Sequence, residues 1–382
     1  MINQLLQNYN NYKEQNLIEL TIKYADIERV VSKLNADFFE ITVLGKSFED
    51  RNIYQIKVGE GKTKILLWSQ MHGNEAVGTM AIFDILNFFV ADDELNSYRQ
   101  KLLKNCTFYF VPMLNPDGAE KKTRRNAQSI DLNRDALKLT APESIILNEI
   151  ADEIMPEFGF NLHDQEIYYG PENSNKTSAL SFLAPAFDYP KTINEKRTKS
   201  MLVIADIFRM LQNYIPNQVA KYNDSFMPNA FGDNIQKKGI STILVEAGYI
   251  LGNEHRQEVR KYYFLSLVYA FYSIVEQNFK KFVLKDYNDI PMNVKLKFCD
   301  YIFKNVTIKQ NNKEFTTDIS VIRNILDSEK FTDYEDDFII WDIGDMQNKF
   351  AFEIIDLKWK KIENGNNIVE RLKKADFLFK YR

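Results

Sequence analysis

Three apolar, strand-like segments of this sequence end at side chains that can bind a metal ion or transfer a proton. They lead to His72, His163 and Glu246, and helix-like segments separate them in the sequence. Strands that alternate with helices predict a parallel or mixed sheet covered on both faces. Sites in such sheets form beyond the carboxyl ends of the strands. We therefore expect these three side chains to meet at one edge of a single sheet.

Histidine is rare in this chain, and two of its three histidines occur at these strand ends. Glu75 follows His72 by three residues, so a short turn can direct both side chains at one point. Two imidazole nitrogens and one carboxylate are the protein ligands of many hydrolytic zinc sites, which leave a fourth position open for water. His72, Glu75 and His163 are therefore the predicted ligands of one zinc ion per chain. The third histidine, His255, lies in a polar segment and is interpreted as a surface residue.

Other charged side chains near these segments are candidates for supporting roles. Glu246 ends an apolar strand, where a buried carboxylate is unfavourable unless it is paired or functional. Burial raises the pKa of such a group toward that of a general base; the alternative is a structural ion pair. Asp131 is a candidate to accept the second ring N–H of a metal-bound histidine, with Asp164 as the alternative. Guanidinium and amide groups in residues 124–134 can hold a carboxylate or an oxyanion, although a basic loop alone is usually solvated surface.

Composition excludes several classes of partner. The formal net charge of −4 and the isoelectric point near 5.7 give no basic surface for nucleic acid. No apolar window approaches the length that spans a bilayer, so we expect no membrane association. The N-terminus lacks the pattern of a secretory signal. Cys106 and Cys299 lie in apolar contexts that favour a reducing compartment. We expect a cytoplasmic protein, and the sequence does not indicate its oligomeric state.

The order of the motifs resembles the zinc carboxypeptidases of the carboxypeptidase A type. HGNE (72–75) is followed by NPDG (115–118), by RxNAxxxDLNR (124–134), by a lone histidine and by a strand-terminal glutamate. The resemblance covers about residues 60–275 and implies an α/β fold with a twisted mixed sheet of about eight strands between helices. We expect a catalytic domain in residues 1–283. A small strand-rich C-terminal domain of unknown role is expected in residues 284–382.

The resemblance also implies a role for each matched residue. His72, Glu75 and His163 correspond to the zinc ligands, Asp131 to the carboxylate that orients the first histidine, Arg124 to the arginine that stabilises the oxyanion, Asn133 and Arg134 to the pair that binds the substrate's terminal carboxylate, and Glu246 to the catalytic base and later proton donor. The family's mobile tyrosine has no aligned counterpart, and Tyr222 is the candidate for it. Asp233 is either an acidic floor of the side-chain pocket or a turn residue.

These correspondences imply a zinc-dependent metallocarboxypeptidase that removes the C-terminal residue of a peptide, with cell-wall-type peptides within the family's range. One alternative is an aspartoacylase-like or succinylglutamate desuccinylase-like zinc amidohydrolase that acts on N-acyl amino acids. The NPDG motif favours the peptidase. A second alternative is a non-catalytic binding protein that retains the fold, but such relatives typically lose a ligand or the base. In either hydrolase the expected partner is a peptide or N-acyl amino acid with a free carboxylate.

Overall fold

A mixed sheet of eight strands forms the centre of this computed structural model, which describes residues 1–310, 313–323, 338–347 and 349–357. The strand order is β1-β2-β4-β3-β5-β9-β7-β8. The strands are β1 (Glu40–Lys46), β2 (Asn52–Val58), β3 (Thr63–Trp68), β4 (Cys106–Val111), β5 (Phe158–Asp164), β7 (Leu180–Leu183), β8 (Val219–Lys221) and β9 (Ser241–Ala247). The four central strands β4, β3, β5 and β9 run parallel, so their carboxyl ends share one edge.

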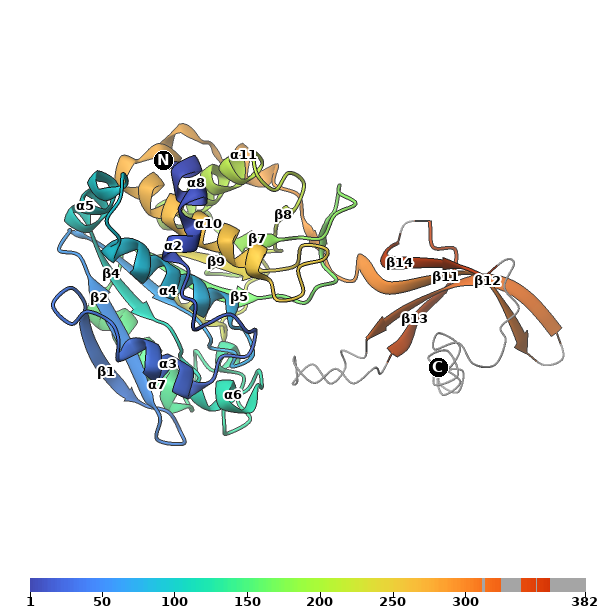
Figure 1. The fold of residues 1–382 in the computed structure, drawn as a ribbon, viewed down its shortest axis with the longest axis horizontal. Coiled ribbons are helices and arrows are strands. Elements are labelled where there is room, and N and C mark those ends of the chain that lie inside the picture. Colours follow the sequence, from blue (N-terminus) through green and yellow to red (C-terminus); the bar gives the residue numbers. More distant parts are fainter. Residues whose placement is uncertain (311–312, 324–337, 348, 358–382) are drawn as a thin grey trace.

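Helices cover both faces of this sheet, which confirms the predicted fold class (Figure 1). One face packs against α1 (Ile2–Gln7), α2 (Tyr9–Tyr12), α4 (Val77–Val90), α5 (Asn96–Asn105), α8 (Glu195–Leu211) and α10 (Gln257–Glu276). The other face packs against α7 (Pro142–Ile154), α9 (Phe231–Lys237) and the short 3₁₀ helix η1 (Leu132–Arg134). Helix α3 (Tyr24–Val31) contacts α6 (Pro116–Lys121), and η2 (Asn278–Lys281) follows α10. Within the described ranges, no helix is both long enough and apolar enough to cross a bilayer.

Strand β3 illustrates how the sequence fixes the sheet. Ile65 and Leu67 pack into the core on the α4 and α10 side, whereas Leu66 and Trp68 pack into the core on the α7 and α9 side. All four side chains are fully buried, and burying a large apolar side chain contributes roughly 1.5–3 kcal/mol. A slip of one residue would exchange the two faces, so the pairing register is strongly specified. The position of His72 beyond the strand end is fixed in consequence.

A second, four-stranded sheet follows the main sheet in the chain, with the order β13-β12-β11-β14. Its strands are β11 (Phe298–Gln310), β12 (Lys313–Arg323), β13 (Phe338–Gly344) and β14 (Phe350–Asp356). It lies to one side of the main body (Figure 1), which confirms a strand-rich C-terminal part. Residues 358–382 of the predicted C-terminal domain lie outside the described residues.

The predicted boundary at residues 283/284 stays a prediction. The segment directly after it contacts the main body: α11 (Leu284–Asn288) packs against α8. The short strand β10 (Asn293–Val294) pairs antiparallel with β6 (Gly170–Pro171). The four-stranded sheet begins only after these contacts, so residues 284–294 connect the two sheets while packing on the first.

Candidate metal centre and active site

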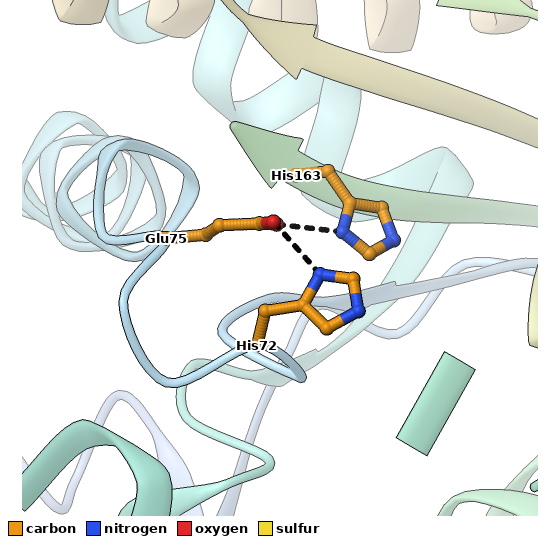
Figure 2. Close-up of side chains that lie close together, drawn as sticks. All are labelled: His72, Glu75 and His163. Carbon is orange, nitrogen blue, oxygen red and sulfur yellow. Dashed lines mark hydrogen bonds and ion pairs between the residues drawn. The ribbon is translucent and has the colours of Figure 1, made fainter. Parts of the chain in front are cut away.

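His72, Glu75 and His163 converge beyond the carboxyl ends of β3 and β5 (Figure 2). The Glu75 carboxylate lies between the two rings, with Oε1 2.8 Å from His72 Nδ1 and Oε2 2.7 Å from His163 Nδ1. One potential ligand atom from each residue lies within 4.8 Å of the others, and all three side chains are buried. This His–Glu–His cluster could hold a metal ion. His255 is two-thirds exposed on the surface, as interpreted from the sequence.

The glycines of the HGNE and NPDG motifs allow two loops to touch beside the cluster. A Cβ atom on Gly73 would lie 2.0 Å from the backbone carbon of Gly118, so a side chain there would force the loops apart. Asn115 holds both loops, because its Nδ2 donates to the Met71 carbonyl at 3.1 Å and its Oδ1 accepts from Gly118 N at 2.8 Å. The NPDG segment is therefore the capped start of α6, and it fixes the backbone that presents His72.

Burial and the mutual charges of the three cluster residues shift their pKa values. Burial disfavours the His72 cation, but the carboxylates of Glu75 and Asp131 outweigh burial, and the pKa of His72 is raised. Burial also opposes ionisation of Glu75, but the two histidines outweigh it and hold the pKa of Glu75 well below its ordinary value. At His163 burial dominates and lowers the pKa. An ionised carboxylate between two imidazoles matches the charge and donor type of a zinc site.

Asp131 and Arg124 contact the cluster from the loop before η1. Asp131 Oδ1 lies 3.1 Å from His72 Nε2, the nitrogen that faces away from Glu75. This contact orients the ring and leaves Nδ1 for the common point. The Arg124 guanidinium lies 3.1 Å from His72 Nδ1 and 3.3 Å from Glu75 Oε1, and its Nε donates to Asp131 Oδ2 at 3.2 Å. Asp164, the alternative to Asp131, instead accepts from Val77 N at 3.1 Å.

Glu246 lies beside the cluster because β9 pairs with β5. In that register Glu246 is the direct neighbour of His163. Its Oε2 atom is buried and has no hydrogen-bond partner in the part of the chain that the structure describes. Burial, together with the charges of Glu75 and Asp164, raises the pKa of Glu246 well above its ordinary value. The sequence allowed a structural ion pair here, but no ion pair of Glu246 occurs among the described residues, so an unpaired acid faces the cluster.

Asn133 and Arg134 lie on η1, on the α9 side of the sheet edge. The Asn133 carbonyl oxygen Oδ1 accepts from Phe231 N at 3.0 Å, which leaves its amide N–H groups for another partner. Arg134 is exposed, and its Nη1 donates to the backbone carbonyl of Asn133 at 2.6 Å. The geometry thus places an amide and an exposed guanidinium together a few residues after Asp131.

Tyr222 and Asp233 are both near the site, with partners of their own. Tyr222 follows β8, its hydroxyl donates to Gln165 Oε1, and its ring meets Tyr169 edge-on at 5.7 Å. Burial and the charge of Glu246 raise the pKa of Tyr222 well above its ordinary value. Asp233 lies in the first turn of α9 and accepts from Met227 N at 2.9 Å. Burial raises its pKa to about 6. The backbone contact fits a turn residue, and the suggested pocket role of Asp233 stays a prediction.

The sequence reasoning missed a polar network built on Gln165. Gln165 Oε1 accepts from Tyr222 and, at 2.6 Å, from Asn293 Nδ2. The Asn293 Oδ1 atom accepts from Ser178 Oγ at 2.7 Å. A Cβ atom on Gly248 would lie 2.5 Å from Gln165 Nε2, so the glycine after Glu246-Ala247 gives this side chain room. Gln165 lies only two residues after His163, and this position was the one sequence feature that could have indicated a side chain near the site.

Comparisons with known proteins agree with this arrangement. A family model described as zinc carboxypeptidase matches residues 25–180, a range that contains the His–Glu–His cluster and ends before Glu246. Human carboxypeptidase D is 26% identical over 153 residues, which is 35% of this chain and 11% of that protein. Carboxypeptidase SOL1 of Arabidopsis thaliana is 27% identical over 130 residues, which is 31% of this chain and 26% of that protein. The chain thus matches a minor part of these curated relatives.

Solved structures share the fold. A metallo-carboxypeptidase from Burkholderia cenocepacia superposes with a TM-score of 0.54 at 16% identity, covering 67% of this chain and 69% of that chain. Bovine thrombin-activatable fibrinolysis inhibitor, solved with tick carboxypeptidase inhibitor, superposes with a TM-score of 0.52 at 16% identity, covering 68% of this chain and 98% of that chain. At such low identity these superpositions support the fold only. Residues 25–180 thus match the sequence model of zinc carboxypeptidases, and the main sheet has the fold of solved metallocarboxypeptidases.

Proposed function

We propose that the protein is a zinc-dependent metallocarboxypeptidase that hydrolyses the C-terminal peptide bond of peptides. The observation that carries the proposal is the convergence of two imidazole nitrogens and the Glu75 carboxylate beside an unpaired carboxylate, Glu246. The donor set fits zinc, since catalytic zinc sites use two histidines and a carboxylate and need an adjacent group to move protons. Zinc, when bound, would supply polarisation of water and of the scissile carbonyl.

Two groups of this chain would act on the reacting atoms around the cluster, and a third would position a metal ligand. Glu246 would take a proton from the attacking water and later return it to the leaving amine, because its Oε2 is buried without a partner among the described residues. Arg124, which lies against Glu75 and His72, would donate to the oxygen of the scissile carbonyl as negative charge develops there. Asp131 would hold the His72 ring in place throughout.

Asn133 and Arg134 would bind the terminal carboxylate of the peptide. A guanidinium matches a carboxylate through two parallel hydrogen bonds, and Arg134 is exposed at the site edge. The Asn133 amide N–H groups lie beside it. Binding the free carboxylate here would restrict cleavage to the last peptide bond, which is the difference between an exopeptidase and an endopeptidase.

The activity is tested directly by incubating the zinc-loaded protein with a mixture of peptides and N-acyl amino acids and identifying the products by mass spectrometry. The mixture includes cell-wall-type peptides. Release of C-terminal residues supports the proposal. Release of an acyl acid from an N-acyl amino acid would instead identify an amidohydrolase, and no product from any substrate would contradict both hydrolytic functions.

Removing the metal is expected to abolish activity and to lower the thermal midpoint of unfolding. A ligand that binds only the folded state at a thousand times its Kd stabilises that state by about 4 kcal/mol. Without the ion, the ionised Glu75 is left buried between its histidines. The measurement is zinc content by mass spectrometry with differential scanning calorimetry, before and after chelation and after zinc is restored. A protein that takes up no zinc and shows no thermal shift would contradict the assignment of the cluster.

Replacing Arg134 with alanine is expected to raise KM for peptides with a free C-terminus and to leave the rate on C-terminally amidated peptides unchanged. A hydrogen bond to a charged group contributes about 1.5–3 kcal/mol, so kcat/KM should fall about 10- to 150-fold. The matched control is Arg125→Ala, because Arg125 is an exposed arginine in the same loop and donates to the Ser129 carbonyl. Equal losses in the two variants would place the carboxylate-binding site elsewhere.

A further inference from the structure

A cavity of about 430 Å³ lies between the main body and the four-stranded sheet. We call it the junction cavity. Its main-body wall includes Glu166 and Tyr168 from the segment after β5, and Tyr249 from the segment after β9. Its opposite wall includes Phe352 and Glu353 of β14. The C-terminal sheet therefore supplies part of a binding-sized hollow that the main body alone does not enclose.

The main-body wall of the junction cavity is formed by segments that follow the strands bearing His163 and Glu246. Glu166 follows His163 by three residues, and Tyr249 follows Glu246 by three residues. Arg256 also lines the cavity, and its Nη1 donates to the carbonyl of Ala247, the residue next to Glu246. The strands that carry His163 and Glu246 thus continue directly into the segments that line the cavity.

The junction cavity and the terminal-carboxylate site lie on different sides of the sheet edge. Arg256 directly precedes α10, which covers one face of the sheet. Asn133 contacts Phe231 at the start of α9, which covers the other face. The His–Glu–His cluster lies at the ends of β3 and β5, two central strands of the sheet. A peptide whose terminal carboxylate is held by Asn133 and Arg134 would therefore direct its amino-terminal part toward the junction cavity.

The wall of the junction cavity combines aromatic rings with an excess of carboxylates. The ring of Phe352 meets the ring of Tyr249 at 5.5 Å and that of Tyr168 at 6.2 Å. The lining contains four carboxylates and two guanidinium groups, which belong to Glu166, Glu254, Asp300, Glu353, Arg256 and Arg323. Aromatic faces and carboxylates together attract cations, since the ring quadrupole and the negative charge act in the same direction.

The four carboxylates differ in the partners that they already have. Asp300 is occupied, because its Oδ2 accepts from the Tyr168 hydroxyl at 2.6 Å and from Arg323 N at 2.8 Å. Glu166 Oε2 lies 3.6 Å from Lys295 Nζ and has no hydrogen-bond partner among the described residues. Glu254 and Glu353 are exposed, and neither forms an ion pair with any residue in the described ranges. The buried Arg256 can donate to a peptide carbonyl in the same cavity.

We propose that the junction cavity binds a primary ammonium group on the amino side of the scissile bond, with Glu254 and Glu353 as its counter-charges and the three rings as its wall. The inference rests on the proposed carboxypeptidase function and names the substrate class: peptides that carry an amine upstream of the cleaved bond. The amine can be the N-terminal amino group of a short peptide or a lysine-type side chain, since both present the same charge.

The test uses tripeptides that share the C-terminal residue released fastest from the peptide mixture. One pair compares a free N-terminus with an N-acetylated one, and the other compares lysine with norleucine at the first position of acetylated peptides. We expect kcat/KM about tenfold higher for the amine-bearing member of at least one pair, mainly through KM. In the variant Glu254→Gln/Glu353→Gln this preference should disappear, with the neutral peptides cleaved at rates within about twofold of the parent. Glu149→Gln, an exposed glutamate on α7, is the matched control and should keep the preference.

A binding measurement separates this inference from the proposed activity. The same four tripeptides are titrated by calorimetry into the zinc-loaded Glu246→Gln protein, with and without the two cavity substitutions. Tighter binding of an amine-bearing peptide that depends on Glu254 and Glu353 supports the cavity even if the parent protein hydrolyses nothing. Equal affinity and equal kcat/KM for all members of both pairs, or a preference that survives the double substitution, would overturn it.

Discussion

Replacing Glu246 with glutamine is expected to lower kcat by about 10²- to 10⁴-fold while the protein keeps one zinc ion per chain. Glutamine has the shape of glutamate but cannot accept a proton at neutral pH, so the general base is lost and the pocket is retained. The metal ligands His72, Glu75 and His163 are unchanged. The loss should appear in kcat more than in KM, because proton transfer belongs to the transition state. Steady-state kinetics and zinc analysis on the same preparation check both halves.

The thermal midpoint of unfolding is a second quantity that the Glu246→Gln substitution is expected to affect. Burial and the charges of Glu75 and Asp164 raise the pKa of Glu246, so its ionised form is unfavourable in the folded protein. Removing that charge should leave the thermal midpoint unchanged or higher, as expected where function is maintained at the expense of stability. The control is Glu157→Gln at the opposite end of β5, where the carboxylate pairs with Lys199 at 3.2 Å and should not affect the rate. Full activity in the Glu246 variant would remove Glu246 from the mechanism.

The His–Glu–His cluster was predictable because its geometry follows from local rules. Apolar strands of β3, β5 and β9 run parallel, so the residues at their carboxyl ends meet whatever separates them in sequence. Glu75 is three residues from His72, and a single turn suffices to bring both side chains together. The contact of Asp131 with His72 was predicted from the order of the motifs along the chain. That order matches a family whose members share one three-dimensional arrangement of these residues.

The polar network around Gln165 was not predictable, because its members come together only through long-range packing. Asn293 lies 128 residues after Gln165 in the chain and is the first residue of β10. It contacts Gln165 because α11 and β10 pack on the main body. No periodicity or motif marks such an asparagine. The junction cavity is similar, since its walls come from loops of the main body and from β14. Contacts between two sheets depend on how the sheets pack, and a single sequence does not encode that packing as a local pattern.

Replacing His163 with alanine is expected to reduce zinc affinity by about 10²-fold or more, whereas His255→Ala leaves it unchanged. Apparent binding free energies for zinc held by four side chains are about 10–16 kcal/mol, so one ligand contributes about 3 kcal/mol on average. His163 Nδ1 faces Glu75 at 2.7 Å inside the core, and His255 is on the surface. Competition with a zinc-binding dye measures both affinities, and circular dichroism confirms that each variant is folded.

Asp131→Asn is expected to reduce zinc affinity by an intermediate amount. It removes the carboxylate that faces His72 Nε2 at 3.1 Å but no ligand, and such outer partners contribute about 10- to 100-fold in metal affinity. Zinc affinity should therefore fall less than in His163→Ala and more than in His255→Ala. The order matters because His163 would bind the ion directly, whereas Asp131 would act on it only through the His72 ring that it contacts. Equal zinc affinity in His163→Ala and His255→Ala would mean that the buried cluster is a structural hydrogen-bond network and not a metal site.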